Sequence, residues 1–388
     1  WGLALPIWIF EDGSFFVVGS KQELQELAVE GWEEFEGKSP HRPWIDKIKI
    51  KHPETGLVGE RILDVGNPWL DAGIVPFSTL KYNTDRDYWS QWFPGDFVTE
   101  CFPGQFRNWF YSLLAMSAEL EGKAPFKTLL GHALVKDETG RDMHKSWGNA
   151  IWFDDASEKM GVDVMRWMYS LQNIEQNLLF GYGPADEARK KLITLWNVYS
   201  FYATYAAVDG FNPSKNPLDV DELNILDRWI IAKVNVLARD GRASMDQFRV
   251  DEFMKSFEIF LEELSNWYVR RNRRRFWKSE DDQDKNSAYA TLYYVLKNTI
   301  TLIAPVLPFI SETIYQNLVV NSDSNAKESV HLCDFPEPVS GWINQELIIN
   351  VDSLRKLVEL GRSARSKSKV KIRQPLAKVS FAIEDNKV

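Results

Sequence analysis

A stripe of apolar residues at helical spacing is the feature that most constrains the fold. Between positions 253 and 267, most apolar residues follow one another in steps of three or four: Phe253, Phe257, Phe260, Leu261, Leu264 and Trp267. Such steps place side chains on one face of an α-helix, and a face this apolar has to be buried. Similar patterns recur at 219–241, 288–304 and 309–318. The second half of the chain is therefore predicted to be an all-α helix bundle with short loops.

The helix that carries this stripe is expected to continue into a cluster of arginines. Five of the six residues from 270 to 275 are arginines, namely Arg270, Arg271, Arg273, Arg274 and Arg275. Glu258, Glu262 and Glu263 can pair with some of them, but not with all. Because the whole chain has a net charge of −9, positive charge gathered in one place indicates a contact with a phosphate backbone. A solvated basic helix face is the alternative interpretation.

The first half of the chain has a different pattern, in which short strand-like runs alternate with turns and helices. We expect strands within 3–8, 15–18, 61–65 and 129–136, a strand that ends near Glu100, and helices over 21–34 and 105–120. In open α/β sheets, ligands bind outside the carboxyl ends of the strands. We predict an α/β domain over residues 1–184, a helical domain over 185–345 and a basic connector over 346–388.

A polar loop follows the strand predicted at 129–136 and has the sequence Gly-Arg-Asp-Met-His-Lys-Ser-Trp-Gly-Asn over 140–149. The loop carries the ammonium of Lys145, the hydroxyl of Ser146 and two glycines, so it can close over a polyphosphate. It is not a Walker A loop, because His144 stands where that motif requires Gly before Lys-Ser. A polar surface turn is the alternative.

The order of residues in this loop resembles the KMSKS signature of class I aminoacyl-tRNA synthetases. Asp142 replaces a Lys of the signature and His144 replaces a Ser, whereas the positions that match are Met143, Lys145, Ser146, Gly148 and Asn149. Four further segments resemble the isoleucyl-tRNA synthetases in particular: 100–110, 196–201, 267–277 and 373–376. The resemblance implies the C-terminal half of a Rossmann-like nucleotide-binding domain, followed by a helix-bundle anticodon-binding domain.

The resemblance also implies a role for each matching residue. It assigns catalysis to Lys145 and Ser146, contacts with ATP or the adenylate to Glu100, Gln105, Met143 and Lys145, the walls of the amino-acid pocket to Trp69 and Trp109, and tRNA binding to the five arginines of 270–275. The implied reaction activates L-isoleucine with ATP, accompanied by Mg²⁺, and then transfers it to tRNA(Ile).

Other expectations rest on what the sequence lacks. The His-x-Gly-His signature, which grips ATP in this family, is absent, and the chain begins without Met. We therefore expect a fragment of a longer protein that is inactive by itself. Cys101 and Cys333 cannot form a four-thiolate zinc site, so no zinc or other metal site is expected in this segment. No uncharged apolar run is long enough to span a bilayer, and we expect a monomeric, cytoplasmic protein.

Three alternatives stay open at this point. A valyl or leucyl synthetase would share the fold and the loop, although 196–201 and 373–376 favour the isoleucyl type. A non-catalytic tRNA-binding module descended from a synthetase would explain the departures at Asp142, His144 and Gly104. A structural helix bundle without any RNA role is the third.

Overall fold

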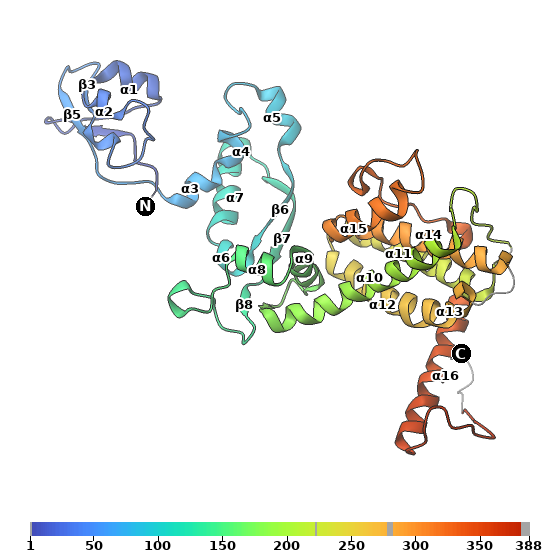
Figure 1. Cartoon of the computed structure of the whole chain (residues 1–388). Helices are drawn as coiled ribbons and strands as arrows, with labels where there is room; N and C mark the ends of the chain where they lie inside the picture. The colour runs from blue at the N-terminus through green and yellow to red at the C-terminus, as the bar shows by residue number, and fades with distance from the viewer. Residues whose placement is uncertain (1, 222, 278–281, 382–388) are drawn as a thin grey trace. The chain divides into compact units, whose positions relative to one another are not determined.

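The computed structural model describes residues 2–221, 223–277 and 282–381. Along the chain, a part that mixes strands and helices precedes a part built of helices (Figure 1). This order confirms the predicted fold class, α/β followed by all-α. Two compact units, residues 1–134 and 135–388, make up the chain. The predicted domain limits at 184 and 345 rest on sequence patterns and stay a prediction.

Unit 1 opens with an antiparallel sheet of five strands in the order β2-β1-β5-β4-β3. The strands are β1 (Ile7–Ile9), β2 (Phe15–Val17), β3 (Ala28–Glu30), β4 (Lys49–Lys51) and β5 (Val58–Arg61). Trp8 is fully buried, and its indole N–H donates to the carbonyl of Ile48 at 2.8 Å. The two strands predicted within 3–8 and 15–18 are confirmed and form a hairpin, whereas the strand predicted at 61–65 lies earlier in the chain.

The prediction of one helix over 21–34 is wrong. Lys21–Leu27 form α1 and Trp32–Phe35 form α2, but the residues between them include strand β3, which pairs with β4. Gly31 turns the chain with a φ of +80°, and a Cβ there would lie 2.0 Å from the carbonyl oxygen of Lys47. The helical spacing of apolar residues is thus overridden by pairing with a strand outside the segment.

The rest of unit 1 contains a parallel pair of strands joined through helices. Its elements are α3 (Pro68–Gly73), α4 (Val75–Ser78), α5 (Arg86–Trp92), β6 (Gly95–Cys101), α6 (Phe102–Gln105), α7 (Trp109–Glu121) and β7 (Phe126–His132). β6 and β7 are parallel, with Glu100 opposite Gly131, so the predicted strand end near Glu100 is confirmed. The helix predicted over 105–120 is divided, because the backbone of Asn108 (φ −108°, ψ −100°) is not helical.

Unit 2 begins with a short parallel pair of strands. Its first elements are β8 (Val135–Asp137), the 3-10 turn η2 (Lys145–Trp147), α8 (Phe153–Lys159), α9 (Val162–Leu171) and β9 (Leu178–Phe180). The strand predicted at 129–136 is wrong in its bounds, since its residues are divided between β7 and β8. The polar loop predicted at 140–149 lies between β8 and α8.

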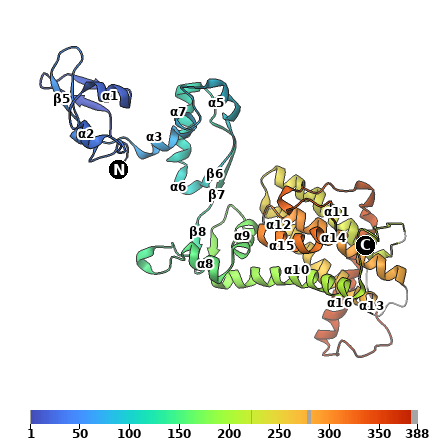
Figure 2. The same cartoon turned by 45° about the horizontal axis from the view of Figure 1, so that its top comes forward.

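A helix bundle completes unit 2 (Figures 1 and 2). Its elements are α10 (Tyr182–Asp209), α11 (Ile225–Asp246), α12 (Val250–Glu262), the π-helical η3 (Glu263–Val269), α13 (Arg270–Trp277), α14 (Asp282–Ile303), α15 (Pro308–Tyr315), the π-helical η4 (Gln316–Val320), the 3-10 turns η5 (Val330–Leu332) and η6 (Ser340–Trp342), and α16 (Gln345–Lys367). The side chains of Phe253, Phe257 and Leu264 are 0% exposed, which confirms the predicted buried stripe. Within the described ranges, no helix combines the length and the apolar character that a membrane span requires.

Candidate functional site

Three of the predicted site residues lie together at the carboxyl end of β6. Glu100 is half-buried, and its Oε1 accepts a hydrogen bond from the backbone N–H of Cys101 at 2.8 Å. Gln105 ends α6, and its Oε1 accepts from the backbone N–H of Trp109, the first residue of α7, at 3.3 Å. This end of a parallel strand is where α/β sheets bind ligands.

The two predicted pocket tryptophans come from helices that pack against each other. The indole N–H of Trp109 donates to the carbonyl of Ala72 in α3 at 3.1 Å. Trp69 is the second residue of the same helix and is 36% exposed. The packing of α3 on α7 is close, since a Cβ at Gly73 would lie 2.7 Å from the carbonyl carbon of Ser112. Local packing therefore brings the segments of Trp69 and Trp109 together.

An apolar pocket of about 430 Å³ lies beside α7, but the two predicted tryptophans do not line it. The lining residues come from α6, α7, β7 and the segment between the two helices: Phe102, Phe106, Arg107, Phe110, Tyr111, Leu114, Phe126 and Leu129. The wall that the resemblance assigns to Trp69 and Trp109 therefore does not coincide with this pocket.

The loop between β8 and α8 is built around the carboxylate of Asp137. Its Oδ1 accepts hydrogen bonds from the N–H of Thr139 at 2.9 Å, the hydroxyl of Thr139 at 2.7 Å and the N–H of Arg141 at 2.9 Å. Its Oδ2 accepts from the side-chain amide of Asn149 at 2.8 Å. The hydrogen bond from Asn149, followed by those from Thr139 and Arg141, lowers the pKa of Asp137 far below its usual value.

Asn149 closes the other end of the loop. Its Nδ2 also donates to the carbonyl of Asp142 at 2.9 Å, and its Oδ1 accepts from the N–H of His144 at 3.0 Å. Asp137 and Asn149 together, which we call the loop clasp, tie the two ends of the loop and hold the backbone just before Lys145. The loop is therefore held by hydrogen bonds among its own residues.

The two departures from the signature have partners inside the loop region. The carboxylate of Asp142 forms an ion pair with the ammonium of Lys136 in β8, and this ammonium lowers the pKa of Asp142. The ring of His144 packs edge-on against Trp147, with 4.3 Å between the ring centroids. The negative charge that replaces a signature Lys is thus neutralised locally.

Lys145 differs from these residues because no carboxylate of the described ranges neutralises it. Its Nζ lies 4.4 Å from the ring centroid of Trp152, which is itself 55% exposed. Among the residues that the structure describes, none forms an ion pair with Lys145. Ser146 is exposed beside it, and Met143 is half-buried. The loop therefore presents one ammonium, held on an aromatic face, that is free to bind an anion.

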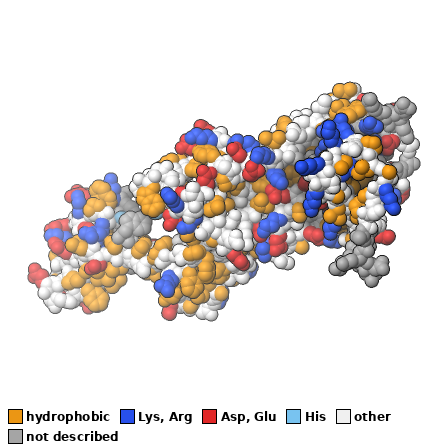
Figure 3. All heavy atoms as spheres, turned by 90° about the horizontal axis from the view of Figure 1, so that it is seen from below, with side chains coloured by type: hydrophobic (Ala, Val, Ile, Leu, Met, Phe, Trp, Pro, Cys, Tyr) orange, Lys and Arg blue, Asp and Glu red, His pale blue; other side chains and the backbone are white. Residues whose placement is uncertain are grey.

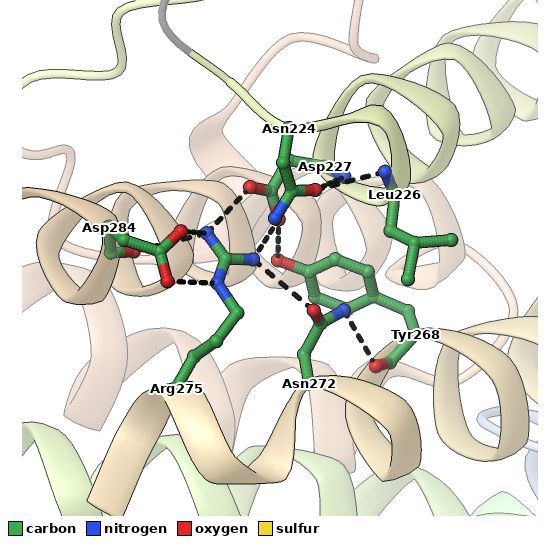
Figure 4. A network of polar contacts seen from close by, with 7 residues as sticks. All are labelled: Asn224, Leu226, Asp227, Tyr268, Asn272, Arg275 and Asp284. Atoms are coloured by element: carbon green, nitrogen blue, oxygen red, sulfur yellow. Dashed lines mark hydrogen bonds and ion pairs between the residues drawn. The ribbon is translucent and has the colours of Figure 1, made fainter. Parts of the chain in front are cut away.

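The arginines of 270–275 do not share one environment. Arg270, Arg271, Arg273 and Arg274 are exposed, whereas the side chain of Arg275 is 13% exposed. Figure 4 shows the Arg275 guanidinium between Asp227 and Asp284, two carboxylates from other helices. Its Nη1 and Nη2 each lie 2.8 Å from an oxygen of Asp227, and Nε donates to Asp284 at 2.9 Å.

This buried network is satisfied on all sides. The Tyr268 hydroxyl donates to Asp227 Oδ1 at 2.7 Å, and Asp227 is 0% exposed. Burial disfavours the charged form of Arg275, but its hydrogen bonds with Asp227 and Asp284 outweigh this and raise its pKa. Unlike the other four arginines, Arg275 therefore forms its ion pairs inside the bundle rather than lying at the surface. Its guanidinium is not positioned to bind a phosphate.

The acids that the sequence offered as partners of the arginines pair elsewhere, so that expectation is wrong. Glu258 accepts from the indole N–H of Trp167 at 3.2 Å. Glu262 and Glu263 instead form ion pairs with Arg355 of α16. Helical spacing could not predict the partner of Glu263, because Arg355 lies 92 positions away along the chain.

Sequence reasoning also missed two residues of the loop region. Asp137 precedes Thr139 and Gly140, and an Asp two residues before a Thr-Gly pair is a turn signal that could have identified it. No sequence signal identifies Trp152, because its role depends on where the loop folds back. Among the described residues, no group of three or more His, Cys, Asp or Glu side chains could hold a metal ion.

Comparison with protein families gives two matches that together cover most of the chain. Residues 1–180 match the tRNA synthetases class I (I, L, M and V), and residues 227–380 match the anticodon-binding domain of tRNA ligase. Relatives with similar sequences include the isoleucine–tRNA ligase of Clostridium tetani, 41% identical over 99% of this chain. That of Methanothermobacter marburgensis is 36% identical over 100% of this chain. In both cases the chain spans 37% of the relative's length.

Solved structures with a similar fold are also synthetases. LeuRS of Agrobacterium radiobacter K84, in a ternary complex with tRNA and LeuAMS, aligns with a TM-score of 0.63 at 15% identity, over 89% of this chain and 42% of that one. The methionyl-tRNA synthetase of Mycobacterium tuberculosis in complex with methionyl-adenylate gives 0.54 at 18% identity, over 74% and 58%. The chain therefore belongs to the class I tRNA synthetases, within the group that contains the isoleucine–tRNA ligases.

Proposed function

We propose that the protein containing this chain is an isoleucine–tRNA ligase, in which this chain supplies the KMSKS-like loop and the surface that binds the anticodon stem of tRNA(Ile). The observation that carries the proposal is the clasped loop with its unneutralised ammonium at Lys145, in a chain 41% identical to a ligase of this specificity. The similarity to isoleucine–tRNA ligases favours isoleucine over valine or leucine as the substrate.

In the proposed reaction, the carboxylate of L-isoleucine attacks the α-phosphorus of ATP. The bond from that phosphorus to the β-phosphate oxygen breaks, so negative charge builds up on the departing pyrophosphate. Lys145 would lie against this charge and stabilise it, with Ser146 and Met143 in the same loop. Mg²⁺ would arrive with ATP, and we assign it no ligand in this chain. A ribose hydroxyl at the tRNA 3′ end then takes the acyl group and releases AMP.

The proposed amino-acid and adenylate contacts come from unit 1. Glu100 would hold the α-amino group or the adenylate, with Gln105 as a second polar contact. Trp69 and Trp109 would wall the apolar slot for the isoleucine side chain. Support comes from the position of Glu100 and Gln105 at the carboxyl end of β6 and from the contact of Trp109 with α3, the helix that contains Trp69.

The proposed tRNA surface consists of Arg270, Arg271, Arg273 and Arg274. All four are exposed, and within the described residues none of them pairs with a carboxylate. We leave Arg275 out of this surface because its charge is neutralised by Asp227 and Asp284. We also propose that the enzyme is monomeric and cytoplasmic. Light scattering would test the monomeric state by measuring the mass of the protein in solution.

Isoleucine-dependent exchange of pyrophosphate into ATP tests the proposal directly. The full-length gene product should catalyse exchange with isoleucine and much more slowly with valine or leucine. Lys145→Ala should lower the rate about 100-fold, as loss of a charge that stabilises the transition state does. Lys297→Ala, which removes an exposed lysine on α14, is the matched control and should change nothing.

The exchange assay, combined with a measurement of tRNA binding, separates the alternatives. A gene product that binds tRNA but catalyses no exchange is a non-catalytic binding module. Exchange that depends on valine or leucine would reassign the specificity. The 388-residue chain alone is expected to be inactive, because it lacks the His-x-Gly-His signature, and exchange by this chain would contradict that expectation.

A further inference from the structure

α16 is held on the bundle by a buried cluster of charges. Glu263 is 2% exposed and forms an ion pair with Arg355 of α16. Lys233 of α11 also binds Glu263, at 2.9 Å, and Arg355 reaches Glu262 at 3.2 Å and Asp352 at 3.1 Å. Since these partners come from α11, α12, η3 and α16, the cluster fixes α16 next to the segment that leads into α13.

The ring of Trp267 marks the place where α13 and α16 approach each other. The guanidinium carbon of Arg271 lies 4.2 Å from the centroid of this ring, and that of Arg355 lies 5.3 Å from it. Arg362 follows Arg355 by seven residues, almost two full helical turns, and therefore projects from the same side of α16. Two arginines from two helices, Arg271 and Arg362, thus face one region of the surface.

These two arginines are close enough to influence each other, and neither has a carboxylate partner in the described part of the chain. Burial, followed by the positive charge of Arg362, lowers the pKa of Arg271. Both side chains are exposed, and among residues 2–221, 223–277 and 282–381 neither forms an ion pair or a hydrogen bond with a carboxylate. Within the described residues, Arg275 and Arg355 both form ion pairs with carboxylates, so Arg271 and Arg362 differ from them in lacking such a partner.

We propose that Arg271 and Arg362 form a two-helix clamp for a single backbone phosphate of RNA; the proposal rests on the proposed function. A phosphodiester carries one negative charge and two free oxygens, and guanidinium groups match that geometry well. An anion bound between the two arginines would also offset the electrostatic repulsion between their positive charges.

The surroundings favour a polyanion over a small free anion. Arg270, Arg273 and Arg274 continue the positive charge along α13, while Lys367, the last residue of α16, and Lys369 continue it at the end of that helix. In the view of Figure 3, Lys and Arg side chains gather over one part of the helical region. A ligand with several phosphates in a row would meet all of these charges, whereas inorganic phosphate would meet only the clamp.

Binding of an unmodified tRNA(Ile) transcript to the full-length gene product, measured over a range of salt concentrations, tests the clamp. Arg271→Ala and Arg362→Ala should each weaken binding about tenfold at low salt and reduce the slope of log affinity against log salt by about one. Because both groups hold one phosphate, the double variant should lose little more than either single variant. Arg239→Ala is the matched control, since that arginine pairs with the neighbouring Asp240.

A structural role would give a different result from the clamp. Removing one of two repelling charges should leave the melting temperature unchanged or raised, while a structural arginine would lower it. Arg362→Lys keeps the positive charge but cannot make the bidentate contact, so it should retain part of the affinity that Arg362→Ala loses. Losses that simply add in the double variant, or single variants that bind like the wild type, would overturn the clamp. Wild-type protein that fails to bind the transcript at low salt would overturn the proposed function itself.

Discussion

Arg271 and Arg275 stand four positions apart on α13, yet the fold treats their charges in opposite ways. Arg275 meets the buried carboxylate of Asp227 at 2.8 Å, and its pKa rises. Arg271 lies on the face of Trp267 with another arginine nearby, and its pKa falls. The comparison teaches that a run of arginines is not one functional patch. The charges left without a partner are the ones available to a ligand.

The loop between β8 and α8 repeats this contrast on a smaller scale. The carboxylate of Asp137 is satisfied by four hydrogen bonds from Thr139, Arg141 and Asn149. Lys145, eight residues later, lies on the face of Trp152 and has no carboxylate partner among the residues that the structure describes. One charge organises the loop and the other is exposed by it. We therefore expect substitutions of Asp137 to change the order of the loop, and substitutions of Lys145 to change the binding of ligands.

The largest expected effect comes from breaking the internal pair. Arg275→Ala leaves the carboxylate of Asp227 buried without its counter-ion, which should cost the bundle about 3 kcal/mol. Hydrogen exchange of peptides from α11 and α13 measures the loss. Arg271→Ala, the matched substitution at the surface, should change stability by no more than about 0.5 kcal/mol.

A second variant separates the charge from the packing at this site. Replacing both partners together, as in Arg275→Met with Asp227→Leu, should recover much of the loss, because no unpaired charge stays buried. The contrast within α13 breaks down if Arg275→Ala is as mild as Arg271→Ala. It also breaks down if Arg275→Ala weakens tRNA binding while leaving exchange in the bundle unchanged.

Opening the loop clasp should have the next largest effect. Asp137→Ala removes the acceptor for the Arg141 N–H and for the side chain of Asn149. We expect faster hydrogen exchange at residues 139–144 and about tenfold slower isoleucine-dependent pyrophosphate exchange, since Lys145 loses its position. Asp154→Ala, an exposed carboxylate at the start of α8, is the control. Faster loop exchange with an unchanged reaction rate would show that the clasp does not position Lys145.

The sequence predicted features that depend on local spacing. The stripe from Phe253 to Trp267 was predicted and is buried, because helical periodicity is a property of the segment itself. The strand end at Glu100 and the polar loop around Lys145 were also predictable, because strand-to-turn changes and glycine-containing polar runs are local sequence signals. These elements position the candidate site, so its outline was accessible without coordinates.

Features that depend on distant partners were not predicted. Asp227 lies 48 positions from Arg275, and no local pattern shows that this one arginine is turned inward. The segment 21–34 has a helical pattern, but β4 draws Ala28–Glu30 into a sheet. The same holds for Trp152, which meets Lys145 only because the loop folds back. Long-range pairing decides such cases and is invisible to spacing rules.

A smaller effect should follow from removing the aromatic face beneath Lys145. If the ammonium has to leave Trp152 to reach a phosphate, Trp152→Leu frees it and lowers the KM for ATP about two- to fivefold, because an exposed cation–π contact is worth about 0.5–1 kcal/mol. Trp147→Leu is the control, since Trp147 packs on His144 instead. A raised KM for ATP in Trp152→Leu would mean that Trp152 holds Lys145 in its working position.

The smallest effect concerns pH, and it distinguishes the satisfied carboxylate from an ordinary one. Since the folded protein lowers the pKa of Asp137, the clasp contributes stability that is fully present above the ordinary Asp pKa and is lost as the pH falls through the lowered value. Between pH 5 and 8, the protection of the Arg141 amide, corrected for the intrinsic exchange rate, should therefore stay constant. It should decline only in acid, below about pH 4, and Asp137→Asn, which has no carboxylate to protonate, should lack that decline. If protection of the Arg141 amide falls between pH 7 and 5, the Asp137 carboxylate is not held in its charged form. The contrast between a fully hydrogen-bonded Asp137 and a Lys145 without a carboxylate partner among the described residues would then fail.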